Sequence, residues 1–206
     1  QRHRVSMLFK KESKAPESIK NLGLNTWYSS LDDKNRMKLS RYIESADVSS
    51  KLSFFMSITS KALEDDNPRF AVFMCQQAYE LLDLTDYEMF KVNELIIDAY
   101  IGDLKYEDAK AACNANLELY PKIKEEFLKD NNGVLPKKIN FRNRYIDIII
   151  GIDSAYDLGF EMLDKYNQMG LLDDEELEYR RNSLRTHRLQ KLFDSVYTYR
   201  PVGEDH

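Results

Sequence analysis

The sequence predicts an all-α fold, built from stacked antiparallel helical hairpins and followed by a carboxy-terminal hairpin of long helices. Only 7 glycines and 5 prolines occur in 206 residues, so few points force the chain to turn sharply. Few segments alternate apolar and polar residues with the period of two that a half-buried strand requires. Apolar side chains instead recur at steps of three and four, as on one face of an amphipathic helix. This pattern argues against a sheet-based fold.

Charge and turn residues divide the chain into three segments. Residues 1–15 form a basic arm with little apolar content, which we expect to be flexible. Residues 16–134 carry the helical hairpins, and Leu135-Pro136 marks the boundary to a further hairpin over 135–206. Residues 1–44 hold 10 basic and 5 acidic side chains, whereas residues 45–130 hold 9 and 17. This asymmetry fits solvated helix faces or complementarity within the chain. Because the first residue is Gln rather than Met, we expect upstream sequence.

The beginning of the second segment predicts two short helices. One runs from Pro16 toward Asn21, and Asp32 or Asp33 caps another that continues to about Glu44. Trp27 is the only tryptophan. It could anchor a partner, since tryptophan often dominates interfaces, but we favour packing in the core of this hairpin.

A helical hairpin is specified most clearly between Thr85 and Pro121. Thr85 stands three residues before Glu88, the spacing of a capping box at a helix start. The apolar stripe that follows consists of Val92, Leu95, Ile96, Ala99 and Tyr100. Gly102 is expected to end the first helix in a left-handed conformation. A second helix over 106–120 is expected to end at Pro121.

The same spacing occurs earlier in the chain. The inward positions of the second helix are Ala109, Cys113 and Asn116, and 38 residues before them stand Ala71, Cys75 and Ala78. Asn67-Pro68 supplies a cap followed by proline at the first helical position. Two consecutive hairpins therefore share one register, although any pair of antiparallel amphipathic helices shows small residues at such spacings.

Tyr100, Tyr106, Ala109 and Pro121 fall at the spacing of the tetratricopeptide (TPR) pattern, and the segment resembles a TPR hairpin. The resemblance is partial, because Cys113 stands where the family has an aromatic residue. It implies a groove lined by the first helix of each hairpin. The polar residues of that helix that the core does not claim, Lys91, Asn93 and Asp98, are the candidate contacts with a protein or peptide.

The two cysteines indicate a compartment. Cys75 and Cys113 lie on predicted buried faces at equivalent repeat positions, so we expect core thiols rather than a disulfide. Sparse cysteine usage fits a reducing, cytoplasmic location. No apolar run approaches the ~20 residues of a membrane span. The first ten residues also lack the apolar centre of a secretory signal.

The longest helix signal lies in the third segment. Apolar residues follow three- and four-residue steps from Tyr145 to Met169, which predicts one continuous helix that ends at Gly170. Gly159 within it marks a place of close approach by another helix. Acidic residues 173–176 begin the next helix, where the helix dipole favours negative charge.

The run from Met162 through Leu184 resembles the carboxy-terminal SHOCT element, a helix-turn-helix implicated in oligomerisation. The shared features are a leucine-bearing helix, a Gly-Leu turn, an acidic cap and spaced leucines. Our predicted helix continues past Leu184 to about Tyr197, unlike the family. The resemblance implies self-association, and hence a possible homodimer through this hairpin.

Basic residues cluster on one face of the last predicted helix, namely Arg180, Arg181, Arg185, Arg188 and Lys191. With Arg142, Arg144 and the basic arm, this face could grip a nucleic acid backbone. Leu177 and Leu184 lie on the same face, which is typical of arginine stems packed along apolar surface or of a face seated on an acidic protein segment.

The sequence contains no recognisable catalytic or cofactor motif. His187 has no Glu or His at a spacing of three or four, so we expect a surface imidazole and no metal site on this helix. No Gly-rich phosphate loop, nucleophile elbow or paired-cysteine set occurs. We expect no enzyme activity, no cofactor and no metal. The leading hypothesis is a protein-interaction or scaffold module, and the alternative is a nucleic-acid-binding regulator.

Overall fold

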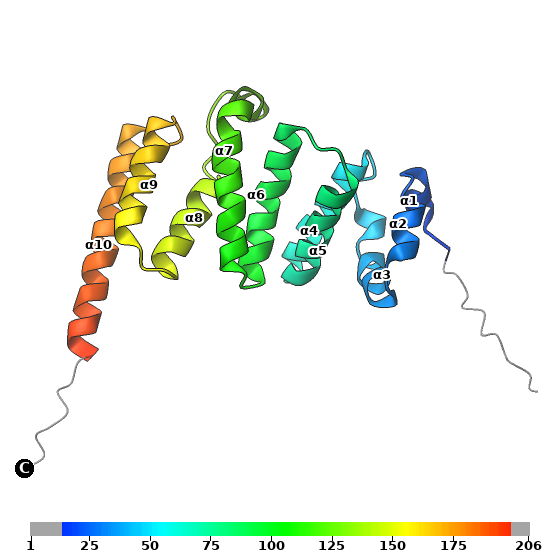
Figure 1. The fold of residues 1–206 in the computed structure, drawn as a ribbon, viewed down its shortest axis with the longest axis horizontal. Coiled ribbons are helices and arrows are strands. Elements are labelled where there is room, and N and C mark those ends of the chain that lie inside the picture. Colours follow the sequence, from blue (N-terminus) through cyan, green and yellow to red (C-terminus); the bar gives the residue numbers. More distant parts are fainter. Residues whose placement is uncertain (1–13, 199–206) are drawn as a thin grey trace, which may run out of the picture. The chain divides into compact units, whose positions relative to one another are not determined.

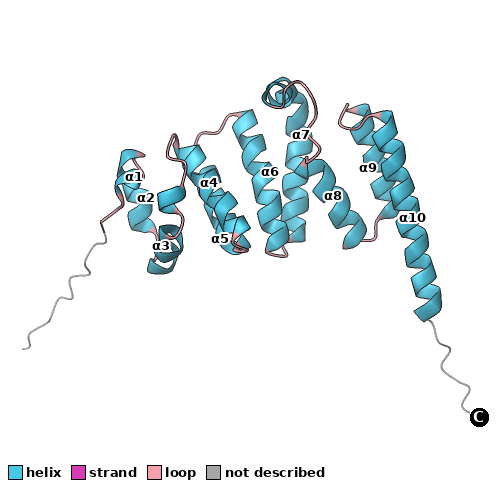
Figure 2. Ribbon diagram, turned by 180° about the vertical axis from the view of Figure 1, so that it is seen from behind, coloured by secondary structure: helices cyan, strands magenta, loops and turns pink. Residues whose placement is uncertain are grey.

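A computed structural model describes residues 14–198, and this part of the chain is all helical, without a strand (Figure 2). The all-α prediction is thus confirmed. The chain divides into two compact units between Leu82 and Asp83. The predicted basic arm falls almost entirely outside the described residues. The predicted segment boundary at residue 135 lies within the second unit, where helices on both of its sides pack together.

The first unit contains five α-helices and one 3₁₀ helix among its described residues (Figure 1). They are α1 Glu17–Asn21, α2 Asn25–Ser30, α3 Asp33–Ser40, η1 Ile43–Ser45, α4 Lys51–Glu64 and α5 Pro68–Leu81. The Asp32 side chain caps α3 and the Ser50 side chain caps α4, because each accepts a hydrogen bond from an amide three residues later. These polar residues therefore fix where the two helices begin.

Trp27 belongs to the core of this first unit. Its indole ring packs edge-on against Phe55, with 5.1 Å between ring centroids, and its Nε1 donates to Oε1 of Gln77 over 2.9 Å. The ring is buried and its only donor is satisfied. The preference for a core role over a partner anchor is confirmed.

The second unit contains five α-helices among its described residues, including the two longest, α7 and α10 (Figure 1). They are α6 Asp86–Gly102, α7 Tyr106–Asp130, α8 Asn140–Gly151, α9 Tyr156–Gln168 and α10 Asp174–Thr198. Each helix packs against the next one along the chain, and α8 also packs against α6. The capping box predicted at Thr85 and Glu88 is present in both directions.

The α4–α5 and α6–α7 turns have the same backbone conformation at an offset of 38 residues. The amide of Asn67 donates to the carbonyl of Ala62, and the amide of Lys105 donates to that of Tyr100 in the same way. Asp66, which precedes Asn67, and Leu104, which precedes Lys105, both have left-handed backbones, with φ 54° and φ 59°. The prediction that Gly102 takes this conformation is wrong, because Gly102 is still helical and the turn occurs two residues later.

The inward positions of both hairpins are buried, as predicted. Ala71 and Ala109 are fully buried, and Cys75 and Cys113 are buried free thiols. Burial raises the pKa of each thiol, to about 12 for Cys75. Both cysteines therefore behave as small core residues rather than as a disulfide or a reactive pair.

Helix α7 continues through Pro121 to Asp130, which corrects the predicted end at Pro121. Proline leaves the carbonyl one turn earlier without its amide donor and clashes with it, at a cost of ~3 kcal/mol. Pro121 lies on the exposed side of the helix, whereas Tyr120, Ile123 and Phe127 are buried on the other side. Burial of these three large side chains outweighs the local penalty.

The predicted continuous helix over residues 145–169 is two helices, α8 and α9, with a turn at residues 152–155. Ile152, which the spacing placed inside, is exposed, and Ser154 is left-handed with φ 53°. The apolar steps remain in phase across the break, so the spacing alone could not reveal it. The carboxy-terminal part therefore contains three helices rather than a two-helix hairpin.

At Gly159 of α9, side chains of two neighbouring helices come close. A Cβ atom there would lie 2.8 Å from Cδ1 of Ile150 on α8 and 3.3 Å from Cδ1 of Leu184 on α10. Neighbouring helices do approach Gly159 closely, but through side-chain atoms rather than through their backbones.

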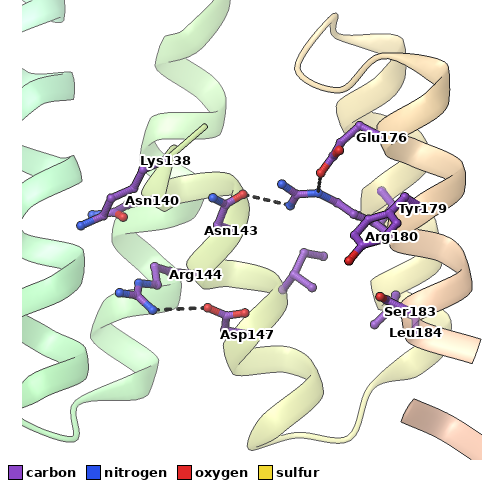
Figure 3. A pocket seen from close by; sticks show the side chains of 12 residues that line it. Lys138, Asn140, Asn143, Arg144, Asp147, Glu176, Tyr179, Arg180, Ser183 and Leu184 are labelled. Carbon is purple, nitrogen blue, oxygen red and sulfur yellow. Dashed lines mark hydrogen bonds and ion pairs between the residues drawn. The ribbon is translucent and has the colours of Figure 1, made fainter. Parts of the chain in front are cut away.

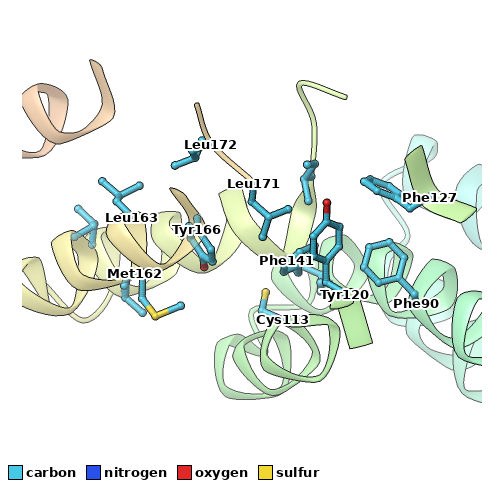
Figure 4. Packing of buried hydrophobic residues seen from close by; sticks show 14 of the residues in the cluster. Phe90, Cys113, Tyr120, Phe127, Phe141, Met162, Leu163, Tyr166, Leu171 and Leu172 are labelled. Carbon is cyan, nitrogen blue, oxygen red and sulfur yellow. The ribbon is translucent and has the colours of Figure 1, made fainter. Parts of the chain in front are cut away.

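The core of the second unit is continuous from α6 to α10 (Figure 4). At its aromatic end, the Phe90 ring lies 5.3 Å from Phe127 and 5.6 Å from Phe141, both edge-on. Tyr166 and Leu171 continue the same core toward α9 and the α9–α10 turn. Helices on both sides of residue 135 therefore depend on one hydrophobic core.

Candidate functional site

Helix α10 is longer than α9 and continues beyond it (Figure 1). Arg188 forms an ion pair with Asp157 of α9 over 3.4 Å, and Lys191 hydrogen-bonds the hydroxyl of Ser154 in the preceding turn. These contacts lie at the beginning of α9, so the last two turns of α10 extend past its neighbour.

The extended part of α10 exposes a row of apolar side chains, which we call the α10 stripe. It consists of Leu189, Leu192, Phe193 and Val196, with exposed fractions of 57%, 57%, 57% and 70%. Their steps of three, one and three residues place them on one face of the helix. A contiguous exposed apolar patch of this kind marks an interaction surface more often than chance exposure does.

A groove of about 500 Å³ lies between α9 and α10 beside this stripe, and we call it the α9–α10 groove. Its lining consists of Phe160, Arg181, Arg185, Arg188, Leu189 and Leu192. The guanidinium carbons of Arg181 and Arg185 lie 5.6 Å and 6.0 Å from the centre of the Phe160 ring. Stacking of this kind holds both guanidinium groups beside the apolar floor.

The structure gathers three of the five predicted basic residues at this groove. Arg181 pairs with Asp164, Arg185 pairs with Glu178 over 3.6 Å, and each pair lies at the surface. With the Arg188–Asp157 pair, each of the three arginines already has one carboxylate neighbour. The basic face is therefore a row of paired arginines beside apolar surface rather than an open cationic patch.

The other two predicted basic residues point elsewhere. Arg180 donates to Glu176 over 2.9 Å and to Oδ1 of Asn143 over 3.0 Å, and so faces α8. Lys191 is directed toward the turn before α9 by its bond to Ser154. His187 is exposed, as predicted, and its Nδ1 shares a 2.6 Å hydrogen bond with the hydroxyl of Tyr156.

Arg180 helps to line a second cleft, of about 520 Å³, between α8 and α10 (Figure 3). Its charged groups pair with one another, since Arg144 lies 3.5 Å from Asp147 and Arg180 bridges Glu176 and Asn143. Arg142, which we had grouped with Arg144 as a nucleic acid contact, is buried and so cannot take that role. It donates to the main-chain carbonyls of Leu171 and Lys137.

The three predicted contacts on α6 are used within the fold. Asn93, which the pattern left outside the core, is buried, and its Nδ2 donates to Oδ1 of Asn116 over 2.8 Å. Asp98 accepts hydrogen bonds from Lys138, Asn140 and Arg144, at 2.9 to 3.2 Å. The ammonium of Lys91 lies 4.8 Å from the centre of the Tyr87 ring. The residues chosen as a peptide-binding set therefore join α6 to α7 and α8 or stack locally.

Glu94 is a key residue that the sequence reasoning missed. One carboxylate oxygen accepts from the amide of Asn140 over 3.0 Å, and the other accepts from the amide of Phe141 over 2.9 Å. Burial is the main reason that its pKa rises to about 7, against the lowering effect of these amides. Helix α8 has no side-chain cap of its own at Ile139. The absence of a local capping residue is the sequence feature that indicates a cap from another part of the chain.

Within residues 14–198, no cluster of three His, Cys, Asp or Glu side chains is arranged to hold a metal ion. In the same range, no helix combines the length and apolar character needed to cross a membrane. Comparison with known proteins returns no matching family model, no matching curated protein and no matching solved structure. Function must therefore be argued from the geometry of the α9–α10 groove and the α10 stripe.

Proposed function

We propose that the chain is a helical protein-interaction module whose binding surface includes the end of α10. The observation that carries the proposal is the α10 stripe, because four apolar side chains on one helical face remain more than half exposed. Burying such a side chain completely is worth ~1.5–3 kcal/mol, so covering the stripe with a partner would be favourable.

A capture experiment tests this proposal with the full chain as bait. The variant Leu192→Glu/Phe193→Glu places two charges on the stripe. The matched control, Leu104→Glu/Val134→Glu, places two charges on other exposed apolar side chains, in the loops before and after α7. We expect a partner that binds the unaltered chain and the control but loses at least tenfold affinity for the double variant. The candidate is then purified and titrated by calorimetry. If every captured protein binds all three baits equally, the proposal is rejected.

The repeated hairpin turn supports a scaffold role for the rest of the chain. The shared turn geometry of α4–α5 and α6–α7 agrees with a TPR-like organisation. Since Asn93 and Asp98 are bonded within the fold, their substitution is expected to lower stability before it alters any partner contact. The buried free thiols favour a reducing, cytoplasmic setting.

Nucleic acid binding is the competing function, and the arginines on α10 are the observation behind it. Three arginines that neutralise phosphates would give a log–log salt slope near ~−2.7 on duplex DNA. Because Leu189 and Leu192 lie among Arg181, Arg185 and Arg188 and offer a phosphate backbone no polar contact, we expect only weak binding of nucleic acid at physiological salt. Fluorescence anisotropy with labelled duplex and single-stranded probes over a salt series decides between the two functions.

A further inference from the structure

We infer that the α9–α10 groove and the α10 stripe together bind an acidic amphipathic helix of a partner protein. This inference rests on the proposed protein-binding function and specifies the chemistry of the partner. It combines an apolar floor, a rim of three arginines and an exposed helical face that continues the floor.

The floor has the dimensions of a helix-binding surface. Phe160 on α9 and Leu189 and Leu192 on α10 form its groove end, and Phe193 and Val196 extend it along α10. From Arg181 to Val196 the helix rises about 22 Å, so a partner helix of about 16 residues would cover it. An amphipathic helix lying in an apolar groove contacts it through residues at steps of three and four.

The rim selects for negative charge because its guanidinium groups are held in place. Arg181 and Arg185 lie over the Phe160 ring, and Arg188 lies 5.8 Å from the centre of the Tyr156 ring. A guanidinium held over an aromatic ring has less rotational freedom, and its planar fork of donors suits two-point bonding to a carboxylate. Less rotamer entropy is lost on binding than for free arginines.

Two of the carboxylates that now pair with these arginines, Glu178 and Asp157, are exchangeable. Asp164 differs from them, because it lies 2.5 Å from Arg181, whose side chain is only 27% exposed. The side chain of Asp157 is 93% exposed and those of Glu178 and Asp164 are about half exposed or more, with pair distances of 3.4 Å and 3.6 Å for the first two. Exposed pairs of this type contribute little, typically ~0–1 kcal/mol. Carboxylates of an incoming helix can therefore share or replace them, while the apolar floor provides most of the affinity.

A second copy of the chain is a poorer occupant of the groove. A symmetric pairing centred on the groove would bring together the same three arginines and three carboxylates from each copy, so it would add no net charge opposite to that of the arginines. An acidic helix supplies the opposite charge along the whole rim. Charge complementarity therefore selects an acidic partner over self-association at this surface.

The test uses two synthetic helical probes of about 16 residues, the length set by the helical rise. Both carry leucine at steps of three and four, but one has glutamate and the other has lysine at the flanking positions. Binding to the full chain is measured by fluorescence anisotropy. We expect the glutamate probe to bind at least tenfold more tightly than the lysine probe, and Arg185→Glu/Arg188→Glu to reverse this preference.

Two controls make the result specific. Lys122→Glu/Lys129→Glu changes the net charge by the same amount on exposed positions of α7, and it should leave the preference for the glutamate probe intact. Leu192→Glu/Phe193→Glu removes the floor and should weaken both probes. Folding of each variant is verified by circular dichroism and urea unfolding.

Three results would overturn the inference. They are equal binding of the two probes, a glutamate-probe affinity that Arg185→Glu/Arg188→Glu leaves unchanged, and a dimer seen by light scattering that Leu192→Glu/Phe193→Glu dissociates. The protein-binding proposal stands or falls separately on the capture experiment, because a partner lost from the stripe variant need not be acidic.

Discussion

Glu94 performs from a distant helix the task that a local cap performs at most helix starts. The first amides of α8 lack partners within the helix, and the two carboxylate oxygens of Glu94 accept from Asn140 and Phe141. The side chain of Asn140 in turn donates to the Glu94 carbonyl over 2.7 Å. A single carboxylate therefore fixes where α8 begins and how it packs on α6.

The raised pKa of Glu94 predicts a pH-dependent stability. Because the folded pKa is about 7 and the reference value is 4.5, the folded state binds the proton more tightly than the unfolded state. The contribution of this group is therefore fully present below about pH 4.5 and is lost as the pH rises through about 7. Glu94→Gln should destabilise the chain at pH 5, and the difference should shrink by pH 8. Urea unfolding at a series of pH values measures it, with Glu125→Gln on an exposed face of α7 as the baseline. A difference that grows with pH would contradict the assignment.

Gly159 allows a second prediction at the level of one residue. A Cβ atom added at Gly159 would lie 2.8 Å from Cδ1 of Ile150 and 3.3 Å from Cδ1 of Leu184, so both side chains must move away from it. Overpacking costs ~1–3 kcal/mol, of which the better helix propensity of alanine returns up to ~1 kcal/mol. We expect Gly159→Ala to lower the free energy of unfolding by about 1 kcal/mol. Gly151→Ala meets open space and is the matched control, so it should be neutral or slightly stabilising. Equal effects of the two substitutions would show that α9 is not tightly packed.

The ends of individual helices show which features the sequence could predict. Thr85 and Asp32 begin helices as expected, since a side-chain cap acts on amides only two or three residues away. The continuation through Pro121 does not follow from local sequence, because it depends on the burial of Tyr120, Ile123 and Phe127. The break after Gly151 does not follow from it either, because the apolar spacing stays in phase across the break. Helix starts set by nearby capping residues can therefore be predicted from the sequence. A helix that continues because distant packing outweighs a local penalty cannot.

The candidate site also has one part that the sequence predicts and one part that it does not. The basic face of α10 follows from helical spacing, so Arg181, Arg185 and Arg188 could be placed together. Phe160 could not be placed beneath them, because its position depends on the unpredicted turn between α8 and α9. The burial of Asn93 does not follow from its polarity, because it depends on Asn116, a buried partner on another helix.

Pro121 provides a prediction at the level of one helix. If α7 is continuous, Pro121→Ala restores an amide donor to the preceding turn and removes a steric clash. The free energy of unfolding should then rise by roughly 1–3 kcal/mol. The matched control is Pro136→Ala in the loop before α8, where the loss of a rigid residue should be neutral or destabilising. If Pro121→Ala also fails to stabilise the chain in urea unfolding, α7 ends near residue 120 in solution.

At the scale of the whole molecule, the hydrophobic core determines what can fold alone. Ile139, Phe141 and Ile149 follow the predicted boundary at residue 135, yet they pack in the same core as Phe90 and Tyr120. The loop around residue 135 is a turn between packed helices. The division between the two compact units lies instead between Leu82 and Asp83.

Two fragments test this division directly. A fragment of residues 83–206 keeps the core from α6 to α10 together, so we expect it to unfold cooperatively in urea with near-native helicity. A fragment of residues 135–206 loses α6 and α7, which exposes Phe141 and leaves the α8 amides without Glu94. We expect this shorter fragment to show a broad transition or none, and to bind a dye for exposed apolar surface. Cooperative unfolding of the 135–206 fragment would instead place an independent domain boundary at residue 135.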